Sequence, residues 1–211
     1  IIRNIMISQY LLINCYSVLK GQEQNIQDFV TKNETITLNK NSFYSSLDGD
    51  ELIEFISLNS LNELTDYENR FALAFSNYAC YLRGDIKREL LRYVESPIKA
   101  RTAIPQTNYV QLRHVEVLPS AYQAYLKWRN ETIFEVIRNN SNTIDSFDAY
   151  HSLISQVPGV MFISCFNGSI EEYMEPFTND HYKNIITQAG DSYITGGNEG
   201  LYTKVYKKLG M

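Results

Sequence analysis

The chain has 211 residues, a formal net charge of −5 at pH 7 and 44% hydrophobic residues. A chain of this length can bury a real core as one large domain or two small ones, and its acidic balance argues against nucleic-acid binding as the main role. No apolar run is long enough for a membrane-spanning helix, so no membrane partner is expected. Three scattered cysteines without a CxxC pair are typical of a reducing compartment, and a cytoplasmic location is expected.

The chain opens with a strand candidate at Tyr10–Val18, followed by a helix expected over Gln22–Lys40. Phe43–Leu58 then contains two strand-like runs around Asp48-Gly49. Asp-Gly accepts the positive φ angles that a two-residue type I′ turn needs, so this stretch predicts a β-hairpin.

A long helix is expected after the hairpin. Ser60 and Glu63 form a capping-box pattern at its start, and broad apolar faces continue as far as Val94. Gly84 is expected to kink or split the helix, and a proline at position 97 prevents its continuation. Ile98–Ile104 is then the candidate for a short closing strand.

The second half repeats this order. Tyr109–Leu118 carries Tyr, Val and Leu at the same places as Tyr10–Leu19, and the following helix places Trp128 where the first copy has Phe29. The other elements expected are a helix over 120–138, an inserted short helix over Ser146–Gln156, a second hairpin over Met161–Phe177 around Asn167-Gly168, a helix over Asn179–Gln188 and a strand over Leu201–Lys207.

Each half therefore has the order strand, helix, strand, strand, helix, strand, which is the split βαβ, ferredoxin-like motif. The predicted fold class is α+β, with two βαββαβ ferredoxin-like repeats forming an intramolecular dimeric α/β barrel. The first repeat, with a long extra helix, spans residues 1–105, and the second, with an inserted short helix, spans residues 106–211. Each sheet would cover the bare face of the other.

The segments LINCYSVLKG and SLDGDELIEFISLNSLNEL in the first half, and YVQLRHVEVLPS with the Asn167-Gly168 hairpin in the second, resemble the dimeric α/β-barrel superfamily. The similarity is to its antibiotic-biosynthesis-monooxygenase-like members. This resemblance implies a barrel that holds ligands between sheet and helices. It also implies an activity drawn from cofactor-free monooxygenases, haem-degrading monooxygenases, isomerases or members without known activity.

In the haem-degrading branch, an Asn precedes the turn glycine and a Trp lies late in the third strand. Asn14 matches the first position, whereas Leu58 stands at the second. The branch also carries a His on the next helix, but no His occurs in this sequence before position 114. In the second half, Arg113 takes the Asn position and Phe177 roughly the Trp position. Neither half keeps the full set, so haem breakdown of that kind is not expected.

Four residues are the candidates for catalysis: Asn14, Tyr16, Arg113 and His114. Asn14 and Tyr16 share one face of the first strand, where an amide and a phenol could orient a substrate carbonyl or enol, or could be satisfied polar groups of the core. Arg113 and His114 lie on opposite faces of their strand, so only one of them can face a pocket. Arg113 could hold a carboxylate and His114 could act as a general base, or each could be a satisfied structural group.

The residues expected to contact a ligand are Phe29, Phe55, Leu58, Trp128 and His151, with packing as the alternative for the aromatic side chains. No HxH or HExxH pattern occurs, and no metal or cofactor is expected.

Two functions remain open on this basis. One is a cofactor-independent monooxygenase or isomerase acting on a small, apolar, conjugated molecule, and the other is a non-catalytic ligand-binding or structural barrel. Pairing of the internal pseudo-dimer into a further homodimer is also left open.

Overall fold

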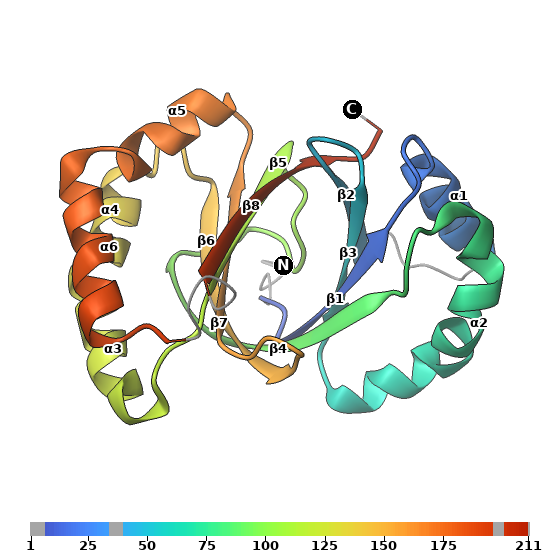
Figure 1. The fold of residues 1–211 in the computed structure, drawn as a ribbon, viewed down its shortest axis with the longest axis horizontal. Helices are drawn as coiled ribbons and strands as arrows, with labels where there is room; N and C mark the ends of the chain where they lie inside the picture. Colours follow the sequence, from blue (N-terminus) through green and yellow to red (C-terminus); the bar gives the residue numbers. More distant parts are fainter. Residues whose placement is uncertain (1–6, 34–39, 196–200, 211) are drawn as a thin grey trace, which may run out of the picture.

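A closed barrel of eight strands forms the centre of the computed structural model, which describes residues 7–33, 40–195 and 201–210. Around the barrel the strand order is β1-β3-β2-β8-β5-β7-β6-β4, and every neighbouring pair is antiparallel. Figure 1 shows helices α1 and α2 on one side of the barrel and α3 to α6 on the opposite side.

The elements follow the chain as two similar series. The first contains β1 (Tyr10–Ser17), α1 (Glu23–Asn33), β2 (Asn41–Ser46), β3 (Glu51–Leu58), a 3₁₀ helix (Leu61–Tyr67), α2 (Glu68–Tyr78) and β4 (Lys87–Ile98). The second contains β5 (Tyr109–Val115), α3 (Tyr122–Glu131), α4 (Ile133–Asn139), β6 (Ser146–Ile154), β7 (Val160–Phe166), α5 (Ile170–Met174), α6 (Asp180–Ser192) and β8 (Leu201–Lys208).

Side-chain alternation along the strands creates two kinds of core, because successive residues of a strand point to opposite faces. The inner residues, such as Ile13, Phe55 and Leu112, form one cluster inside the barrel. The outer residues pack against helices in separate clusters, with Tyr16 in the first half and Phe162 in the second. Strands β1, β3, β5 and β7 are therefore buried on both faces, whereas β4 and β8 are more exposed.

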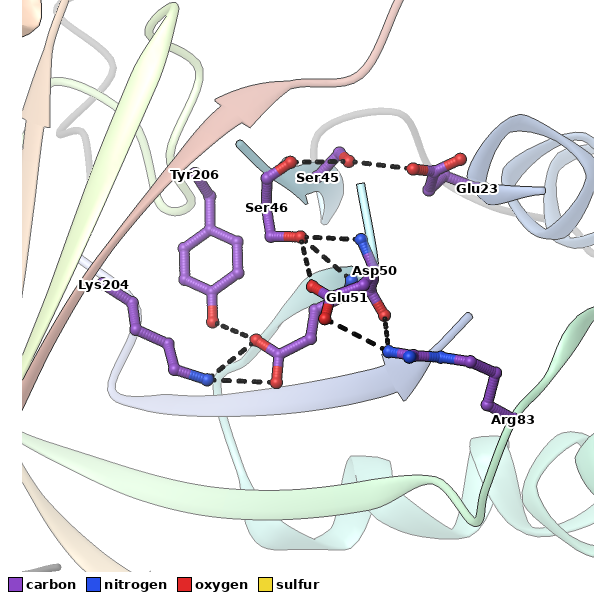
Figure 2. Close-up of polar contacts among 8 residues, drawn as sticks. All are labelled: Glu23, Ser45, Ser46, Asp50, Glu51, Arg83, Lys204 and Tyr206. Atoms are coloured by element: carbon purple, nitrogen blue, oxygen red, sulfur yellow. Dashed lines mark hydrogen bonds and ion pairs between the residues drawn. The ribbon is translucent and has the colours of Figure 1, made fainter. Parts of the chain in front are cut away.

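The two halves meet at two seams, where β4 pairs with β6 and where β2 pairs with β8, and the second is short, with three partner pairs. Figure 2 shows that Glu51, the first residue of β3, reaches across to β8 at this point. Its carboxylate accepts hydrogen bonds from Nζ of Lys204 at 3.0 Å and from the hydroxyl of Tyr206 at 2.9 Å. Ser46 and Asp50 hold the adjoining turn through a 3.1 Å hydrogen bond. These side chains reinforce the seam.

The helix expected after the first hairpin is confirmed as far as Tyr78, with Ser60 as its N-cap. Its continuation to Val94 and the closing strand expected over Ile98–Ile104 are wrong. The residues 87–98 form strand β4, which pairs with β1 on one edge and β6 on the other. Two flanking strands outweigh the helical propensity of the Arg-Glu-Leu-Leu run in this stretch. Pro97 is accommodated because the register of β4 with β6 is interrupted between Glu95 and Ile98.

The second hairpin also differs from the expectation. Ser146–Ile154 is strand β6 rather than an inserted helix, and it pairs with β7 through a connection that contains Pro158-Gly159. Gly159 has a φ of 150°, and a Cβ there would lie 2.6 Å from the carbonyl oxygen of Val115. Asn167-Gly168 instead joins β7 to α5, and the Asn167 side chain accepts a hydrogen bond from the backbone N–H of Asn108. Asn167-Gly168 therefore lies in the connection between a strand and a helix, and not in the turn of a hairpin.

The first hairpin is confirmed, with a different turn. β2 and β3 pair in register, and a four-residue connection, residues 47–50, joins them. Gly49 has a φ of 73°, whereas Asp48 does not adopt positive φ, so the turn is not the two-residue type I′ form. The helix expected over Gln22–Lys40 is confirmed as far as Asn33, and positions 34–39 lie outside the described residues.

Asp148 of β6 is an acidic side chain inside the barrel. It is 5% exposed and accepts a hydrogen bond from the hydroxyl of Ser96, and no ion pair involves it within the described residues. Burial raises the pKa of Asp148 from 3.8 to about 6, although the hydrogen bond with Ser96 opposes this shift. Tyr93, Tyr150 and Cys165 face it, and burial raises the pKa of each above its ordinary value, so they stay neutral in this range.

We expect this carboxyl to make stability depend on pH. Between about pH 4 and about pH 6, the native protein retains a proton that the unfolded chain has released, so the free energy of unfolding falls as the pH rises through this window. Asp148→Asn should remove this dependence and raise the free energy of unfolding at about pH 8 by on the order of 1–3 kcal/mol. Urea unfolding of both proteins across this pH range measures the effect, with the exposed Asp145→Asn as the control. A variant less stable than the parent at about pH 8 would contradict it.

No helix in the described part of the chain is long and apolar enough to cross a bilayer. Among the same residues, no group of three or more His, Cys, Asp and Glu side chains is placed to hold a metal ion.

Candidate functional site

A cavity of about 260 Å³ lies between the sheet and the helices of the second half. Phe147 and Phe162 contribute its sheet side, and Met174, Phe177 and Ile186 contribute part of its helical side. The walls are mainly apolar, as is usual for a site that binds a small molecule.

Arg113 is the charged residue in this lining. It is 8% exposed, and its guanidinium carbon lies 3.7 Å from the centroid of the Phe177 ring, a cation–π contact. Its Nη1 donates to the hydroxyl of Tyr182 at 2.9 Å, and its Nε donates to the side-chain oxygen of Gln111. Its Nη2 is buried and has no hydrogen-bond partner among the described residues. One donor of a buried cation is therefore left for a ligand oxygen.

The surroundings of Arg113 hold its orientation. Gln111, two residues earlier on the same face of β5, is fully buried and also accepts a hydrogen bond from the hydroxyl of Tyr173 at 2.8 Å. No ion pair involves Arg113 within the described residues, and its partner in the β5–β7 register is Phe162. The guanidinium is thus fixed by neutral groups and keeps its charge unmatched by a carboxylate.

Tyr125 of α3 adds a second polar group to the cavity. Its hydroxyl is buried without a hydrogen-bond partner in the described chain, and burial raises the pKa of Tyr125 to about 12, so the phenol stays protonated at neutral pH. Behind this wall, Arg129 lies over the rings of Tyr125 and Phe162 and forms an ion pair with Glu95. The cavity therefore offers hydrogen-bond donors and a positive potential.

Asn14 and Tyr16 lie together on the helix-facing side of β1, as expected, but Glu54 lies between them. The buried Glu54 carboxylate accepts hydrogen bonds from Nδ2 of Asn14 at 3.0 Å and from the hydroxyl of Tyr16 at 2.9 Å. Arg70 of α2 forms an ion pair with the same carboxylate at 2.6 Å. Burial, followed by the negative charge of Glu54, raises the pKa of Tyr16 well above its usual range, so this phenol is not a base.

One strand position explains the difference between the halves. Asn14 pairs across β1 and β3 with Glu54, whereas Arg113 pairs across β5 and β7 with Phe162. In the first half the Glu54 carboxylate neutralises Arg70, which reaches it from α2. In the second half the ring of Phe162 stands at the pairing position, and Arg113 faces mainly apolar walls.

His114 points to the inside of the barrel, opposite to Arg113, as strand alternation predicted. Its ring stacks on Tyr202 at a centroid distance of 5.0 Å, and its Nε2 lies 3.1 Å from the carbonyl oxygen of Val157. It is 1% exposed and does not line the Arg113 cavity.

The first-half residues expected to contact a ligand do not line this cavity. Phe29 of α1 packs edge-on against Tyr78 at 5.3 Å. Phe55 lies inside the barrel against Tyr44, and Leu58 packs in an apolar cluster with neighbouring strands.

Trp128 and His151 lie near the second-half site without lining it. Trp128 of α3 packs on Tyr193 at 5.2 Å and on Tyr125, which does line the cavity. His151 was expected on a helix but lies on β6, where it contacts Tyr122 edge-on at 5.3 Å.

Sequence reasoning missed Tyr125 and Tyr182, which belong to helices and come together with Arg113 only in the tertiary structure. The expectation that Phe177 takes the position of a Trp late in the third strand was wrong, because β7 ends at Phe166 and Phe177 lies in a short 3₁₀ helix, Glu175–Phe177. Its ring is the one that Arg113 covers.

Comparison of the sequence with models of protein families, and with curated proteins, finds no match. Solved structures do match over nearly the whole chain. An anthrone oxidase-like protein aligns with a TM-score of 0.69 at 12% identity, covering 96% of this chain and 92% of its own. A monooxygenase-like protein from Listeria innocua aligns with a TM-score of 0.59 at 6% identity, covering 97% and 96%.

A ferredoxin-fold protein from Listeria monocytogenes, described as related to antibiotic biosynthesis monooxygenases, aligns with a TM-score of 0.54 at 8% identity and covers 93% of this chain and 94% of its own. At these identities the likeness concerns the fold. The resemblance inferred from the sequence is confirmed at the level of the fold, a closed eight-stranded barrel like that of ferredoxin-fold proteins related to antibiotic biosynthesis monooxygenases.

We expect Arg70→Leu to be strongly destabilising, because it leaves the Glu54 carboxylate buried without its cation. Removing one partner of a buried ion pair costs about 3–5 kcal/mol. Urea unfolding measures this loss. The double variant Arg70→Leu/Glu54→Gln should recover part of it, since a neutral amide needs no counter-charge. A loss below about 1 kcal/mol in the single variant would show that the network does not hold the first half together.

Proposed function

We propose that this protein binds a small, apolar, conjugated molecule in the cavity of its second half, with one ligand oxygen held by Arg113. The observation that carries the proposal is the unpartnered Nη2 of a buried arginine in a mainly apolar cavity of about 260 Å³. A volume of this size suits a molecule of two or three fused rings, and the apolar walls favour such a ligand by burial of its surface.

We also infer that the chain is a duplicated βαββαβ unit, with residues 1–105 and 106–211 as the halves of an intramolecular dimer. Around the barrel, β4-β1-β3-β2 is followed by β8-β5-β7-β6, so the fourth, first, third and second strands recur in the same order. Asn14 and Arg113 occupy equivalent positions in β1 and β5 under this interpretation. The two copies have then diverged, and only the second pairs its central polar residue with an aromatic ring.

A buried cation of this kind favours a ligand that can carry negative charge on oxygen, such as a phenolate or an enolate. Deprotonation of an enolisable substrate gives an electron-rich carbanion that can react with O₂ without a cofactor. The balanced outcome converts a CH₂ group and O₂ into C=O and H₂O. The resemblance of the fold to an anthrone oxidase-like protein supports this type of substrate.

Ligand binding without catalysis is the second candidate, and the composition of the cavity favours it. No Asp, Glu, His or Lys is among the described residues that line the cavity, so the protein presents no ordinary proton acceptor there. Catalysis would have to rely on the acidity of the substrate itself, which Arg113 increases by stabilising the negative charge on its oxygen.

Binding of 2-naphthol and of naphthalene, which lacks the oxygen, tests the proposal. We expect the wild-type protein to prefer 2-naphthol by about tenfold or more, because a hydrogen bond to a charged group contributes about 1.5–3 kcal/mol. Arg113→Leu should remove this preference, and Arg113→Lys should retain part of it. Fluorescence titration measures the dissociation constants.

Arg88→Leu is the matched control, because Arg88 also lies over a ring, that of Phe71, but in the first half. It should leave the preference unchanged. Equal affinity for 2-naphthol in the wild-type and Arg113→Leu proteins would overturn the proposal. Oxygen uptake with anthrone then separates the two candidates: uptake of one O₂ per substrate that Arg113→Leu lowers supports catalysis, and binding without uptake supports the non-catalytic alternative.

A further inference from the structure

A second cavity, of about 270 Å³, lies at one end of the barrel interior. Leu11 of β1, Tyr150 of β6 and Ile163 of β7 contribute to its walls, together with residues 100–107, which connect β4 to β5. It shares no lining residue with the Arg113 cavity. Strand alternation separates the two, because Asp148 and Ile163 face the barrel interior while Phe147 and Phe162 face the helices.

The deep polar group of this cavity is Asp148. Asp148 is 5% exposed, and its described hydrogen-bond partners are the hydroxyl of Ser96 and the backbone of Ala100. Buried carboxylates in proteins are normally paired with a cation. The described residues supply no such ion pair here, in contrast to Glu54, which has Arg70.

The other charged residues of the lining are exposed. Asp145 stands at the surface, where its carboxylate accepts a hydrogen bond from Nδ2 of Asn167 at 2.7 Å, and Arg101 is also exposed. One acid therefore lies deep in the cavity and a second lies at its rim, against one exposed base. This distribution of charge suits a cation and disfavours an anion.

We propose that this cavity is a binding site for a small organic ammonium ion, with the ammonium group paired to Asp148 and the apolar body packed against Leu11, Ile104 and Ile163. The volume of about 270 Å³ is sufficient for an arylalkylamine. The site is independent of the function proposed for the Arg113 cavity.

Phenethylamine is the probe, with 2-phenylethanol and phenylacetate as neutral and anionic molecules of similar shape. At about pH 8 the Asp148 carboxyl is ionised, because its pKa is about 6. We expect phenethylamine to bind at least about tenfold more tightly than 2-phenylethanol, and phenylacetate to bind most weakly. Isothermal titration calorimetry of the full chain measures all three.

Asp148→Asn should remove the preference for the amine, whereas Asp145→Asn should lower it only slightly and Arg113→Leu should leave it unchanged. Unfolding by urea checks that each variant is folded. The proposal is overturned if the amine and the alcohol bind equally well, if neither binds at millimolar concentration, or if Asp148→Asn keeps the preference. Loss of amine binding in Arg113→Leu would assign the amine to the other cavity and overturn it too.

Discussion

Covering a sheet with helices on one side leaves the other side bare, and this constraint governs the architecture of the protein. The inner faces of its strands are buried by closure of the barrel, where Ile13, Phe55 and Leu112 meet in one cluster. Closure depends on two seams, of which the one between β2 and β8 has three partner pairs and is reinforced by Glu51, Lys204 and Tyr206. The two cavities described above lie on the helix-facing side of the second half and at one end of the barrel interior.

Buried charge then distinguishes the sites. The Glu54 carboxylate is the shared partner of Asn14, Tyr16 and Arg70, so the buried charges of the first half are paired with each other. Arg113 is held by neutral partners and keeps one donor unused. Asp148 has no cation in the described chain. Unmatched charges in cavities are costly to the fold, and their retention is the physical reason for assigning them to ligands.

Much of the fold could be predicted from the sequence. The first hairpin, the strands that begin at Tyr10 and Tyr109, and the opposite orientation of Arg113 and His114 follow from local patterns. The stretches 87–98 and 146–154 could not be assigned locally, because their apolar spacing suits a helix as well as a strand, and only the neighbouring strands decide. Asn167-Gly168 marked a turn, but the following Ser169 caps helix α5.

The candidate site could be predicted only at Arg113. Its surroundings depend on Phe177 and Tyr182, which lie far along the chain and meet it through helix packing. In the same way, no local pattern around Asn14 indicates that Glu54 and Arg70 occupy the space beside it. The difference between the two halves is a property of strand pairing, since Glu54 faces Asn14 and Phe162 faces Arg113.

The most direct measurement is a crystal structure of the protein with bound 2-naphthol. The account predicts ring density in the second-half cavity, with the ligand oxygen within hydrogen-bonding distance of Nη2 of Arg113 and the Glu54–Arg70 pair unchanged. Ligand density beside Asn14 in the first half, or an ion pair between Arg113 and a carboxylate of the protein itself, would contradict it.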